Sequence, residues 1–479
     1  MTPHHARIVG TTGIAAILAL ASTAPAQPMA TANAVRYDDH KLVEVQVRGV
    51  KDILALSALG ADPSCEWRLG TNEARISPDA MEALTALQQS GLRFRVLVEN
   101  LQLVLDAENA RLNPANNHAD GPWFADFKNL AAISAYVDSL VALRPDLASR
   151  INLGNSLEGR PIFGLRITSP ALGQGRGCKP LLLLNSCQHA REWISPMVNM
   201  FTADALIRRY DTDPAIKDIV DNVEIIVVPI ANPDGYEYTW TTNRYWRKNR
   251  RPNAGGSFGV DLNRNWAYQW GGVGASATPT SETYRGTGPF SEPESQRLRD
   301  FALAKPNLRG HTDLHSYGRL ILWPWCFTNT PSPDQAAYLT LGTTMDQRIE
   351  AVHSTTYTPG IWYSTLYPSS GTAIDWTYAI RGATAFTIEL RGSDFVLPAT
   401  EIIPNGEEIL PGLLYQAQWI KERHPFRADF DGNCLYNIND FVAFNNAFAA
   451  MDPAADFDRS GSLNVNDYVA FLNAWAANQ

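Results

Sequence analysis

The sequence predicts an α/β fold, in which one large sheet is covered by helices on both faces, with a small unit on each side of it. Three observations lead to this prediction. Short apolar runs alternate with longer amphipathic segments between residues 123 and 425, which is the pattern of strands and helices in α/β proteins. A turn-rich stretch precedes this region and an internal repeat follows it. The length of 479 residues also suggests about three units.

The chain begins with the pattern of a secretory signal peptide, at residues 1–26. Arg7, without any acidic residue, precedes a mostly apolar run at residues 8–21, and small residues follow at two candidate cleavage sites. This run is too short to span a bilayer. The product is therefore expected to be secreted, either extracellular or periplasmic.

Charge and cysteine content narrow the classes of partner and fold. The net charge is −9 and no block of Lys or Arg occurs, which argues against nucleic acid and anionic membranes as partners. No later apolar run is long enough for a membrane span. The five cysteines are sparse and odd in number, so the chain is not a disulfide scaffold. One pair is possible in an oxidising compartment, but the sequence favours no particular bridge.

Residues 37–112 have the pattern of a small α+β unit, with elements set by apolar alternation and by a helix start at Ser77-Pro78. The turn-forming residues 113–122 then mark an exposed boundary. In order, the expected elements are a strand at 41–50, a helix at 50–59, an extended segment at 65–69, a helix from Pro78, a strand at 92–98 and a helix at 100–110.

The large unit is placed at residues 118–425, where the apolar periodicity alternates between that of strands and that of helices. The expected helices lie at residues 130–147, 196–210 and 407–421. The expected strands lie at residues 151–153, 160–167, 180–185, 223–229, 308–314, 319–323 and 383–390.

The last part of the chain, residues 427–479, is an internal repeat and therefore a separate module. Asp429-Phe-Asp-Gly-Asn is repeated as Asp456-Phe-Asp-Arg-Ser, and both copies end in an Asp followed by an aromatic residue and Val-Ala-Phe. Aromatic residues at helical spacing in each copy are expected to form the core of the module rather than a binding face.

The motif His189-Ala-Arg-Glu192 is the starting point for a metal site. By itself the motif is weak, because with nine His in the chain roughly half a match to His-x-x-Glu is expected by chance. Its context is more specific. The motif follows the expected strand at residues 180–185, and Ser195-Pro196 after it resembles a helix cap and first helical position. Open α/β sheets bind ligands in such strand-to-helix loops.

Zinc in catalytic sites is held by three protein ligands, which leaves a fourth position for water. His189 and Glu192 would supply two of them. His315 ends the expected strand at residues 308–314 and is the preferred third ligand. His311 is the alternative, but it lies earlier in the same run. Cys187 could compete for the metal, although a buried small residue is the more common role of such a thiol.

At this point the sequence resembles a known family. The stretch Gln188-His-Ala-Arg-Glu-Trp-Ile-Ser-Pro196 is similar to the zinc-binding signature of the carboxypeptidase A-like zinc metallocarboxypeptidases, the M14 family. The resemblance covers residues 123–425 and implies a mixed, twisted sheet and one Zn²⁺ in the catalytic domain. Further motifs follow in the family's order: Asn232-Pro-Asp-Gly-Tyr236, Arg244-Tyr-Trp-Arg-Lys248, Gly259-Val-Asp-Leu-Asn-Arg-Asn-Trp266, His315-Ser-Tyr317, Tyr367-Pro-Ser-Ser-Gly-Thr-Ala-Ile-Asp-Trp376 and Phe386-Thr-Ile-Glu-Leu-Arg391.

The resemblance implies a catalytic role for several residues. His189, Glu192 and His315 would hold zinc. Glu389 would be the general base that takes a proton from the attacking water and passes it to the leaving amine. Arg247 would stabilise the oxyanion that develops on the peptide carbonyl.

The resemblance also implies the residues that bind the substrate. Asn263 and Arg264 match a pair that grips the terminal carboxylate, for which a planar guanidinium is well suited. This grip makes the enzyme an exopeptidase. Tyr367 matches a mobile tyrosine that closes over the substrate, and Arg191, inside the signature, is assigned to substrate binding. The enzyme would act on peptides or proteins with a free C-terminus.

Ile374 indicates which terminal residues the enzyme would accept. In the family the corresponding position lies at the base of the pocket for the last side chain, where aspartate favours Lys or Arg and isoleucine favours apolar or aromatic residues. Ile374, with Leu366 and Thr387, resembles the apolar type. A charged guest would be unpaired in such a pocket, which costs several kcal/mol.

Each of the two flanking units also resembles a known type of module. The unit at residues 37–112 is similar to the family's prodomain, which would cover the active site until cleavage near 113–122; an accessory domain is the alternative.

The C-terminal repeat resembles a dockerin-type or EF-hand-like calcium module, with a candidate protein partner. Oxygen ligands suit Ca²⁺, and the candidates are Asp429, Asp431, Asn433, Asn437 and Asp440 in the first loop and Asp456, Asp458, Ser460, Asn464 and Asp467 in the second.

Two other functions are compatible with the same scaffold. The first is an N-acyl amino acid deacylase, against which the carboxylate grip of Asn263 and Arg264 and the presence of Tyr367 argue. The second is a non-catalytic peptide-binding protein, which would be expected to have lost a ligand or the base. Because every expected ligand and the base are present, peptide hydrolysis is the preferred function.

Overall fold

The computed structural model describes residues 34–63, 67, 69–89, 91–112, 122–170, 178–423, 428–458 and 460–476. The expected signal peptide at residues 1–26 and nearly all of the expected boundary at 113–122 lie outside these ranges. Within them, no helix is long and apolar enough to cross a membrane.

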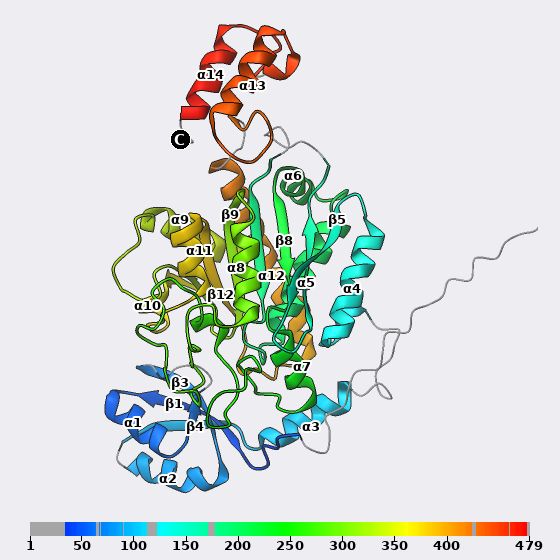
Figure 1. Cartoon of the computed structure of the whole chain (residues 1–479). Helices are drawn as coiled ribbons and strands as arrows, with labels where there is room; N and C mark the ends of the chain where they lie inside the picture. Colours follow the sequence, from blue (N-terminus) through cyan, green and yellow to red (C-terminus); the bar gives the residue numbers. More distant parts are fainter. Residues whose placement is uncertain are drawn as a thin grey trace, which may run out of the picture.

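The large unit forms the middle of the molecule in Figure 1. It contains an eight-stranded mixed sheet, with strand order β11-β10-β12-β9-β7-β8-β6-β5. The four central strands β12, β9, β7 and β8 run parallel, and antiparallel neighbours join on either side, β10 against β12 and β6 against β8. Each expected strand overlaps an observed one, and β11 is additional. The strands are β5 (Ala148–Asn155), β6 (Pro161–Ile167), β7 (Leu181–Ser186), β8 (Glu224–Val228), β9 (Leu308–Ser316), β10 (Leu320–Trp323), β11 (Thr358–Ile361) and β12 (Thr384–Leu390).

Helices cover both faces of this sheet, because its central strands are apolar on both sides. In β7, Leu182 and Leu184 join the core formed with α4, α5, α6, α9 and α12, whereas Leu181 and Leu183 join the core formed with α8 and α11. This alternation confirms the predicted α/β architecture. The helices are α4 (Leu130–Leu143), α5 (Ile194–Arg208), α6 (Pro214–Asn222), α7 (Pro233–Thr241), α8 (Pro293–Leu303), α9 (Gln335–His353), α10 (Trp362–Thr365), α11 (Ala373–Arg381) and α12 (Ile402–Arg423).

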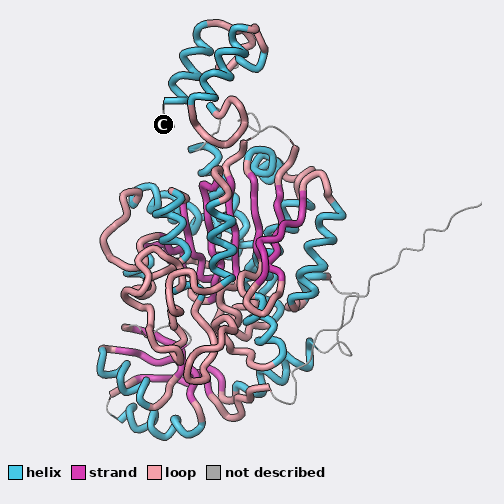
Figure 2. The backbone as a smooth tube through the Cα atoms, viewed as in Figure 1, coloured by secondary structure: helices cyan, strands magenta, loops and turns pink. Residues whose placement is uncertain are grey.

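The N-terminal unit is a four-stranded antiparallel sheet in the order β2-β3-β1-β4, with its own apolar core. Figures 1 and 2 show it at one end of the large unit, with the C-terminal module at the opposite end. Most of the expected extended segment at residues 65–69 lies outside the described residues, and the strand β3 follows it in the chain. The elements are β1 (Lys41–Val47), α1 (Val50–Ala58), β2 (Asp62–Pro63), β3 (Gly70–Ile76), α2 (Pro78–Gln89), β4 (Arg93–Val98) and α3 (Leu101–Leu112).

The C-terminal repeat forms two equivalent helices, α13 (Ile438–Ala449) and α14 (Val465–Ala476), joined by a short 3₁₀ turn. The rings of Phe444 and Phe471, one from each copy, stack with centroids 4.1 Å apart at the centre of the module. These aromatic residues therefore form the core of the module, as expected. Asn437 and Asp440 form the capping box of α13. The expected protein partner of the module remains a prediction.

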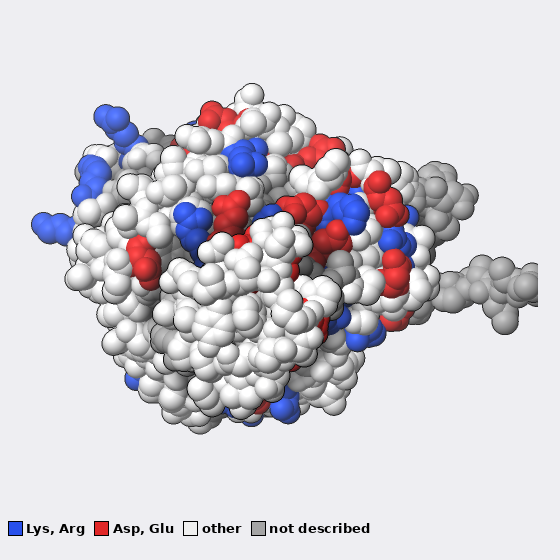
Figure 3. All heavy atoms as spheres, turned by 90° about the horizontal axis from the view of Figure 1, so that it is seen from above, with Lys and Arg blue, Asp and Glu red and all other residues white. Residues whose placement is uncertain are grey.

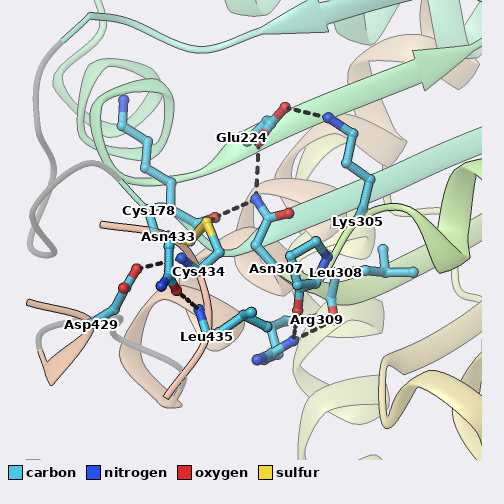
Figure 4. The surroundings of a disulfide bond; sticks show 12 residues. Cys178, Glu224, Lys305, Asn307, Leu308, Arg309, Asp429, Asn433, Cys434 and Leu435 are labelled. Atoms are coloured by element: carbon cyan, nitrogen blue, oxygen red, sulfur yellow. Dashed lines mark hydrogen bonds and ion pairs between the residues drawn. A yellow bond between two sulfur atoms is a disulfide. The ribbon is translucent and has the colours of Figure 1, made fainter. Parts of the chain in front are cut away.

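A disulfide joins the C-terminal module to the large unit, although the sequence favoured no bridge. Cys178, just before β7, pairs with Cys434, with Cα atoms 5.3 Å apart and 256 residues between them in sequence (Figure 4). Cys434 stands where such loops usually carry glycine, and it adopts a left-handed φ of 67°. Cys187 and Cys326 are buried free thiols.

Acidic and basic side chains are interspersed on the face drawn in Figure 3. A broad area of that face shows neither acidic nor basic side chains.

Candidate metal centre and active site

His189 and Glu192 lie in the loop between β7 and α5. One detail of the prediction is wrong: Ser195 does not cap α5, because the helix already begins at Ile194. Instead, the Ser195 hydroxyl donates a hydrogen bond to the Glu192 carbonyl oxygen, at 2.9 Å. The loop therefore turns directly into the helix, and this turn presents the His189 and Glu192 side chains at the carboxyl end of β7.

His315 lies near the carboxyl end of β9, and the structure brings it to His189 and Glu192. The His189 Nδ1 and His315 Nδ1 atoms are 3.0 Å apart, and they lie 2.8 and 3.0 Å from the two carboxylate oxygens of Glu192. All three residues are buried, and their ligand atoms lie within 4.8 Å of one another. Two imidazoles and one carboxylate facing a common point are a ligand set of catalytic zinc.

His311, the alternative ligand, is directed away from this point. Its Nε2 is 2.6 Å from Asn185 Oδ1 and its Nδ1 is 2.8 Å from Thr377 Oγ1. Burial lowers the pKa of His311 to about 4, so the ring is neutral. The thiol of Cys187 contacts the carbonyl oxygens of His189 and Ala190, and burial raises its pKa well above the ordinary value.

Two buried aspartates that the sequence analysis did not single out contact the outer nitrogens of the histidines. Asp261 Oδ1 is 3.1 Å from His189 Nε2, and Asp313 Oδ2 is 2.7 Å from His315 Nε2. Such carboxylates fix the tautomer and the orientation of metal-binding histidines. Asp313 stands two residues before His315 in the same strand, which was the only signal for it in the sequence.

Glu389 lies in β12 at the position paired with His315 of β9. Its side chain is buried, and its Oε2 atom has no hydrogen-bond partner among the described residues. Burial raises the pKa of Glu389 to about 8, against the opposing charges of His315 and Arg247. A buried carboxylate oxygen without a partner beside a metal-ligand cluster is suited to accept a proton from a reactant.

Arg247 and Arg264 lie on either side of Asp261. Arg247 Nη2 donates to Asp261 Oδ2 at 2.8 Å, whereas the closest contact of Arg264 with that atom is 4.0 Å. Arg264 is instead held by the carbonyl oxygens of Gly274 and Asn263. Its Nη2 atom is buried without a hydrogen-bond partner in the described part of the chain, so one end of the guanidinium is left for a ligand.

The other expected substrate-binding residues differ in how close they lie to this guanidinium. The amide oxygen of Asn263 accepts a hydrogen bond from the backbone of Ala373, and Arg264 Cζ lies 5.9 Å from the ring centroid of Tyr367. Arg191 has other surroundings. Its guanidinium lies over the ring of Phe395, and Nη1 donates to a backbone carbonyl.

Ile374 and Tyr367 belong to one small apolar cluster, together with Leu366, Cys326 and Trp362. The Thr387 hydroxyl, from β12, is buried without a hydrogen-bond partner among the described residues. Thr387 stands two residues after Ala385, which is a member of the cluster. Cys326 and Trp362 were not singled out from the sequence.

The N-terminal unit packs against the same end of the sheet. The Tyr317 hydroxyl, just after β9, donates to Glu73 at 2.5 Å, and Arg244 Nε donates to the buried Glu108 at 2.9 Å. An apolar cluster with members from both units, including Tyr245, surrounds these contacts. The unit therefore covers the region next to the third metal-ligand residue.

Comparison with known proteins assigns this site to a family. The sequence model of the family described as zinc carboxypeptidase matches residues 133–412, more than half of the chain. This chain belongs to the zinc carboxypeptidase family. It is 35% identical to carboxypeptidase A1 of Rattus norvegicus over 384 residues, which are 78% of this chain and 90% of the relative. It is 34% identical to carboxypeptidase B of Bos taurus, over 70% of this chain and 80% of the relative.

Two solved structures have the same fold as this chain. Carboxypeptidase A from Helicoverpa armigera superposes with a TM-score of 0.72 at 28% identity, over 81% of this chain and 98% of that one. Thrombin activatable fibrinolysis inhibitor superposes with a TM-score of 0.74 at 25% identity, over 80% of this chain and 99% of that one. The matched share of this chain is larger than the large unit, so each superposition also includes residues outside that unit.

The chain is therefore a zinc metallocarboxypeptidase that acts on peptides and uses one zinc ion. The side chains present fit that ion, because three ligand atoms converge and the outer nitrogen of each histidine meets a carboxylate. The expected secreted location agrees with this family, and a disulfide in the structure also fits an oxidising compartment.

Proposed function

We propose that this zinc carboxypeptidase removes apolar or aromatic residues from the C-terminus of peptides, with His189, Glu192 and His315 as the zinc ligands. One observation carries the proposal. Among the described residues, the buried Nη2 atom of Arg264, in the 3₁₀ turn Leu262–Arg264, and the buried Oε2 atom of Glu389, in β12, have no hydrogen-bond partner. In this proposal Arg264 binds the terminal carboxylate and Glu389 acts on the last peptide bond.

The bound zinc supplies a Lewis acid that polarises the peptide carbonyl and activates water. Glu389 takes the proton of the attacking water on Oε2 and later delivers it to the leaving amine. Its burial favours the protonated form, which suits it to carry that proton between the two steps. Arg247, fixed by Asp261, presents its positive charge to the oxyanion that develops on the carbonyl.

The pocket for the last side chain is the apolar cluster around Ile374. Leu366, Cys326 and Trp362 share its walls, and each is buried. A terminal Lys or Arg would place a charge among these apolar side chains, and the adjacent buried Asp375 already accepts from the backbone N–H of Cys326. The cost of such an unpaired charge favours apolar guests.

The N-terminal unit acts as a prodomain in this proposal, and cleavage at residues 113–122 separates it from the enzyme. The Glu108–Arg244 and Glu73–Tyr317 contacts support this role, because they fix the unit beside the active site. Limited proteolysis of the purified precursor should therefore increase its activity. If the uncleaved chain is fully active and cleavage does not change its activity, then the unit is an accessory domain instead.

Cation binding by the C-terminal repeat is a second candidate function, favoured by one observation. Asp429 Oδ1 is buried without a hydrogen-bond partner among the described residues, and Asp429 clusters with Asp431 and Asp440. Burial, with the neighbouring carboxylates, raises the pKa of Asp429 to about 7. Ca²⁺ fits such a group of oxygens. The second loop has a matching cluster, formed by Asp456, Asp458 and Asp467.

A thermal unfolding experiment tests this cation site. Calcium should raise the unfolding temperature of the module, and Asp429→Asn should abolish that increase. Asp452→Asn, a control at the cap of the connecting 3₁₀ turn, should leave it unchanged. An unfolding temperature that does not respond to calcium would exclude the site.

A peptide panel that varies only in its last residue tests the main proposal. We expect release of terminal Phe and Leu, loss of release with a chelator, and recovery with zinc. The same peptides with an amidated C-terminus should not be cleaved. Cleavage of N-acyl amino acids in preference to peptides would favour the deacylase alternative, and zinc binding without cleavage would favour the non-catalytic one.

A further inference from the structure

Asp313 is a buried carboxylate that is surrounded by hydrogen-bond donors at the zinc site. Its Oδ2 atom lies 2.7 Å from His315 Nε2 and accepts from Gln188 Nε2 at 2.5 Å. Its Oδ1 atom accepts from Asn185 Nδ2 at 2.7 Å. The side chain has no exposed surface. Such a complete set of partners compensates for the cost of burying the charge.

The donors come from neighbouring elements whose register fixes their positions. Asn185 in β7 is paired with Asp313 in β9, so the two side chains meet across adjacent parallel strands. Gln188 follows β7 in the loop that carries His189, and its amide oxygen accepts from Trp266 Nε1 at 3.2 Å. The orientation of Asp313 is therefore determined by the sheet and by the loop that bears the first zinc ligand.

A directed chain of hydrogen bonds continues outward from Asn185. Because Asn185 donates its amide hydrogen to Asp313, its Oδ1 accepts from His311 Nε2, at 2.6 Å. The His311 Nδ1 atom lies 2.8 Å from the Thr377 hydroxyl, which also lies 3.1 Å from the Ala373 carbonyl oxygen. Donation therefore runs from His311 to Asn185 and from Asn185 to Asp313.

This arrangement determines which nitrogen of His315 faces the metal. A carboxylate at Nε2 requires the hydrogen to be there, which leaves the lone pair on Nδ1, the atom that lies 3.0 Å from Glu192. Asp261 does the same for His189, but it also binds Arg247 and the backbone of Asn263. Among the proposed ligands, Asp313 contacts His315 alone, so its contribution can be isolated.

We propose that Asp313 is a positioning residue for zinc, which holds His315 with Nδ1 toward the metal, and that Asn185, His311 and Thr377 orient its carboxylate. The proposal rests on the assignment of His315 as a zinc ligand. It also explains His311, a buried histidine close to the centre that takes no part in the ligand cluster.

Zinc affinity, measured by competition with a chromophoric chelator, tests the proposal on the full chain. Asp313→Asn should weaken zinc binding by roughly 10- to 100-fold, the usual effect of removing such a partner. Asp234→Asn is the matched control, since Asp234 is equally buried but bonds to Ser156, Glu158 and Arg160. Its zinc affinity should remain at the wild-type value. An Asp313→Asn affinity within about twofold of wild type would overturn the proposal.

Kinetics with saturating zinc separate positioning from a general loss of structure. Asp313→Asn should lower kcat while KM for a terminal-Phe peptide stays near the wild-type value, because the carboxylate grip is not touched. If Asp313→Asn fails to fold, His311→Gln provides the second test, with a smaller loss of zinc affinity expected. An unchanged zinc affinity in His311→Gln would show that the hydrogen bonds beyond Asn185, those of His311 and Thr377, do not help to orient Asp313.

His315→Ala distinguishes failure of this inference from failure of the proposed function. If His315→Ala loses zinc but Asp313→Asn does not, only the positioning role is wrong. If His315→Ala keeps wild-type zinc affinity, then the ligand assignment itself is wrong. A double variant of Asp313 and His311 should be less impaired than the sum of the single effects, because both act on one chain of hydrogen bonds.

Discussion

Glu389 and His315 occupy paired positions on the neighbouring parallel strands β12 and β9. Parallel strands end at the same edge of a sheet, so this pairing places the expected base beside an expected zinc ligand. The same register pairs Thr387 with Asp313, two residues earlier in each strand. One strand pair thus carries the expected base, an expected zinc ligand, the proposed positioning residue Asp313 and the buried hydroxyl of Thr387.

Glu389→Gln should abolish peptide hydrolysis but keep the metal. The amide cannot accept the proton of the attacking water, and general-base catalysis of this kind contributes roughly 100- to 10,000-fold to the rate. The zinc content of the purified variant, measured by atomic emission, should equal that of the wild type. Glu422→Gln, at the exposed end of α12, is the control. Retained turnover in Glu389→Gln would contradict the proposed mechanism.

Arg264→Lys should impair recognition of the free C-terminus. Lysine keeps the charge but lacks the planar fork that binds a carboxylate with two hydrogen bonds. We expect kcat/KM for a terminal-Phe peptide to fall by roughly 100-fold, which corresponds to about 3 kcal/mol. Arg297→Lys, a partly exposed arginine of α8, should behave as wild type. Equal cleavage of free and amidated peptides by the wild type would argue against this role.

Ile374→Asp should change the preference from terminal Phe and Leu to terminal Lys and Arg. A carboxylate at this position would pair with a basic guest and would be left unpaired by an apolar one. The measurement is the ratio of kcat/KM for terminal-Arg and terminal-Phe peptides in the variant and in the wild type. A wild-type enzyme that already prefers terminal Arg would show that other residues determine the pocket.

The sequence predicted the sheet and the pair His189 and Glu192 from local patterns, whereas His315 had to be chosen from the end of a distant strand. Strands such as β7 are continuous apolar runs, and His189 and Glu192 are three residues apart. By contrast, β3 (Gly70–Ile76) was missed, since its polar residues Asn72, Glu73 and Arg75 conceal the alternation of a strand. The start of α5 was misplaced because Ser195 donates to a backbone carbonyl instead of capping the helix.

Features that depend on distant residues were harder to predict. Cys178 and Cys434 pair across 256 residues of sequence, and no local pattern indicates such a contact. Asp313 was visible beside His315, but its role depends on Asn185 and Gln188 from another strand and loop. His311 is distinguished from His315 only by the direction of its side chain, which becomes apparent when the partners of each ring are known.

Glu294 should make the stability of the enzyme depend on pH. Burial raises the pKa of this carboxyl to about 7. Between about pH 4.5 and 7 the folded chain therefore holds a proton that the unfolded chain has released, so the free energy of unfolding falls as the pH rises. The full shift corresponds to about 3 kcal/mol.

Glu294→Gln should remove that pH dependence, because the amide resembles the neutral carboxyl. The unfolding temperatures of variant and wild type should be similar at pH 5, and the variant should be more stable at pH 7.5. The exposed Glu422→Gln should show no such difference. A constant offset between Glu294→Gln and the wild type at both pH values would contradict the raised pKa.

Breaking the disulfide should loosen the C-terminal module without affecting catalysis. Cys178 precedes the amino end of β7, whereas His189 follows its carboxyl end, so the disulfide and the metal-ligand cluster lie at opposite ends of one strand. Disulfides typically contribute about 2–4 kcal/mol of stability.

In the double variant Cys178→Ser/Cys434→Ser, the module should unfold at a lower temperature and be cleaved faster by added protease, while kcat and KM stay at wild-type values. The wild type should acquire the same behaviour when a reductant is added, and the double variant should not respond to it. Equal protease resistance with and without reductant would show that non-covalent contacts alone hold the module in place.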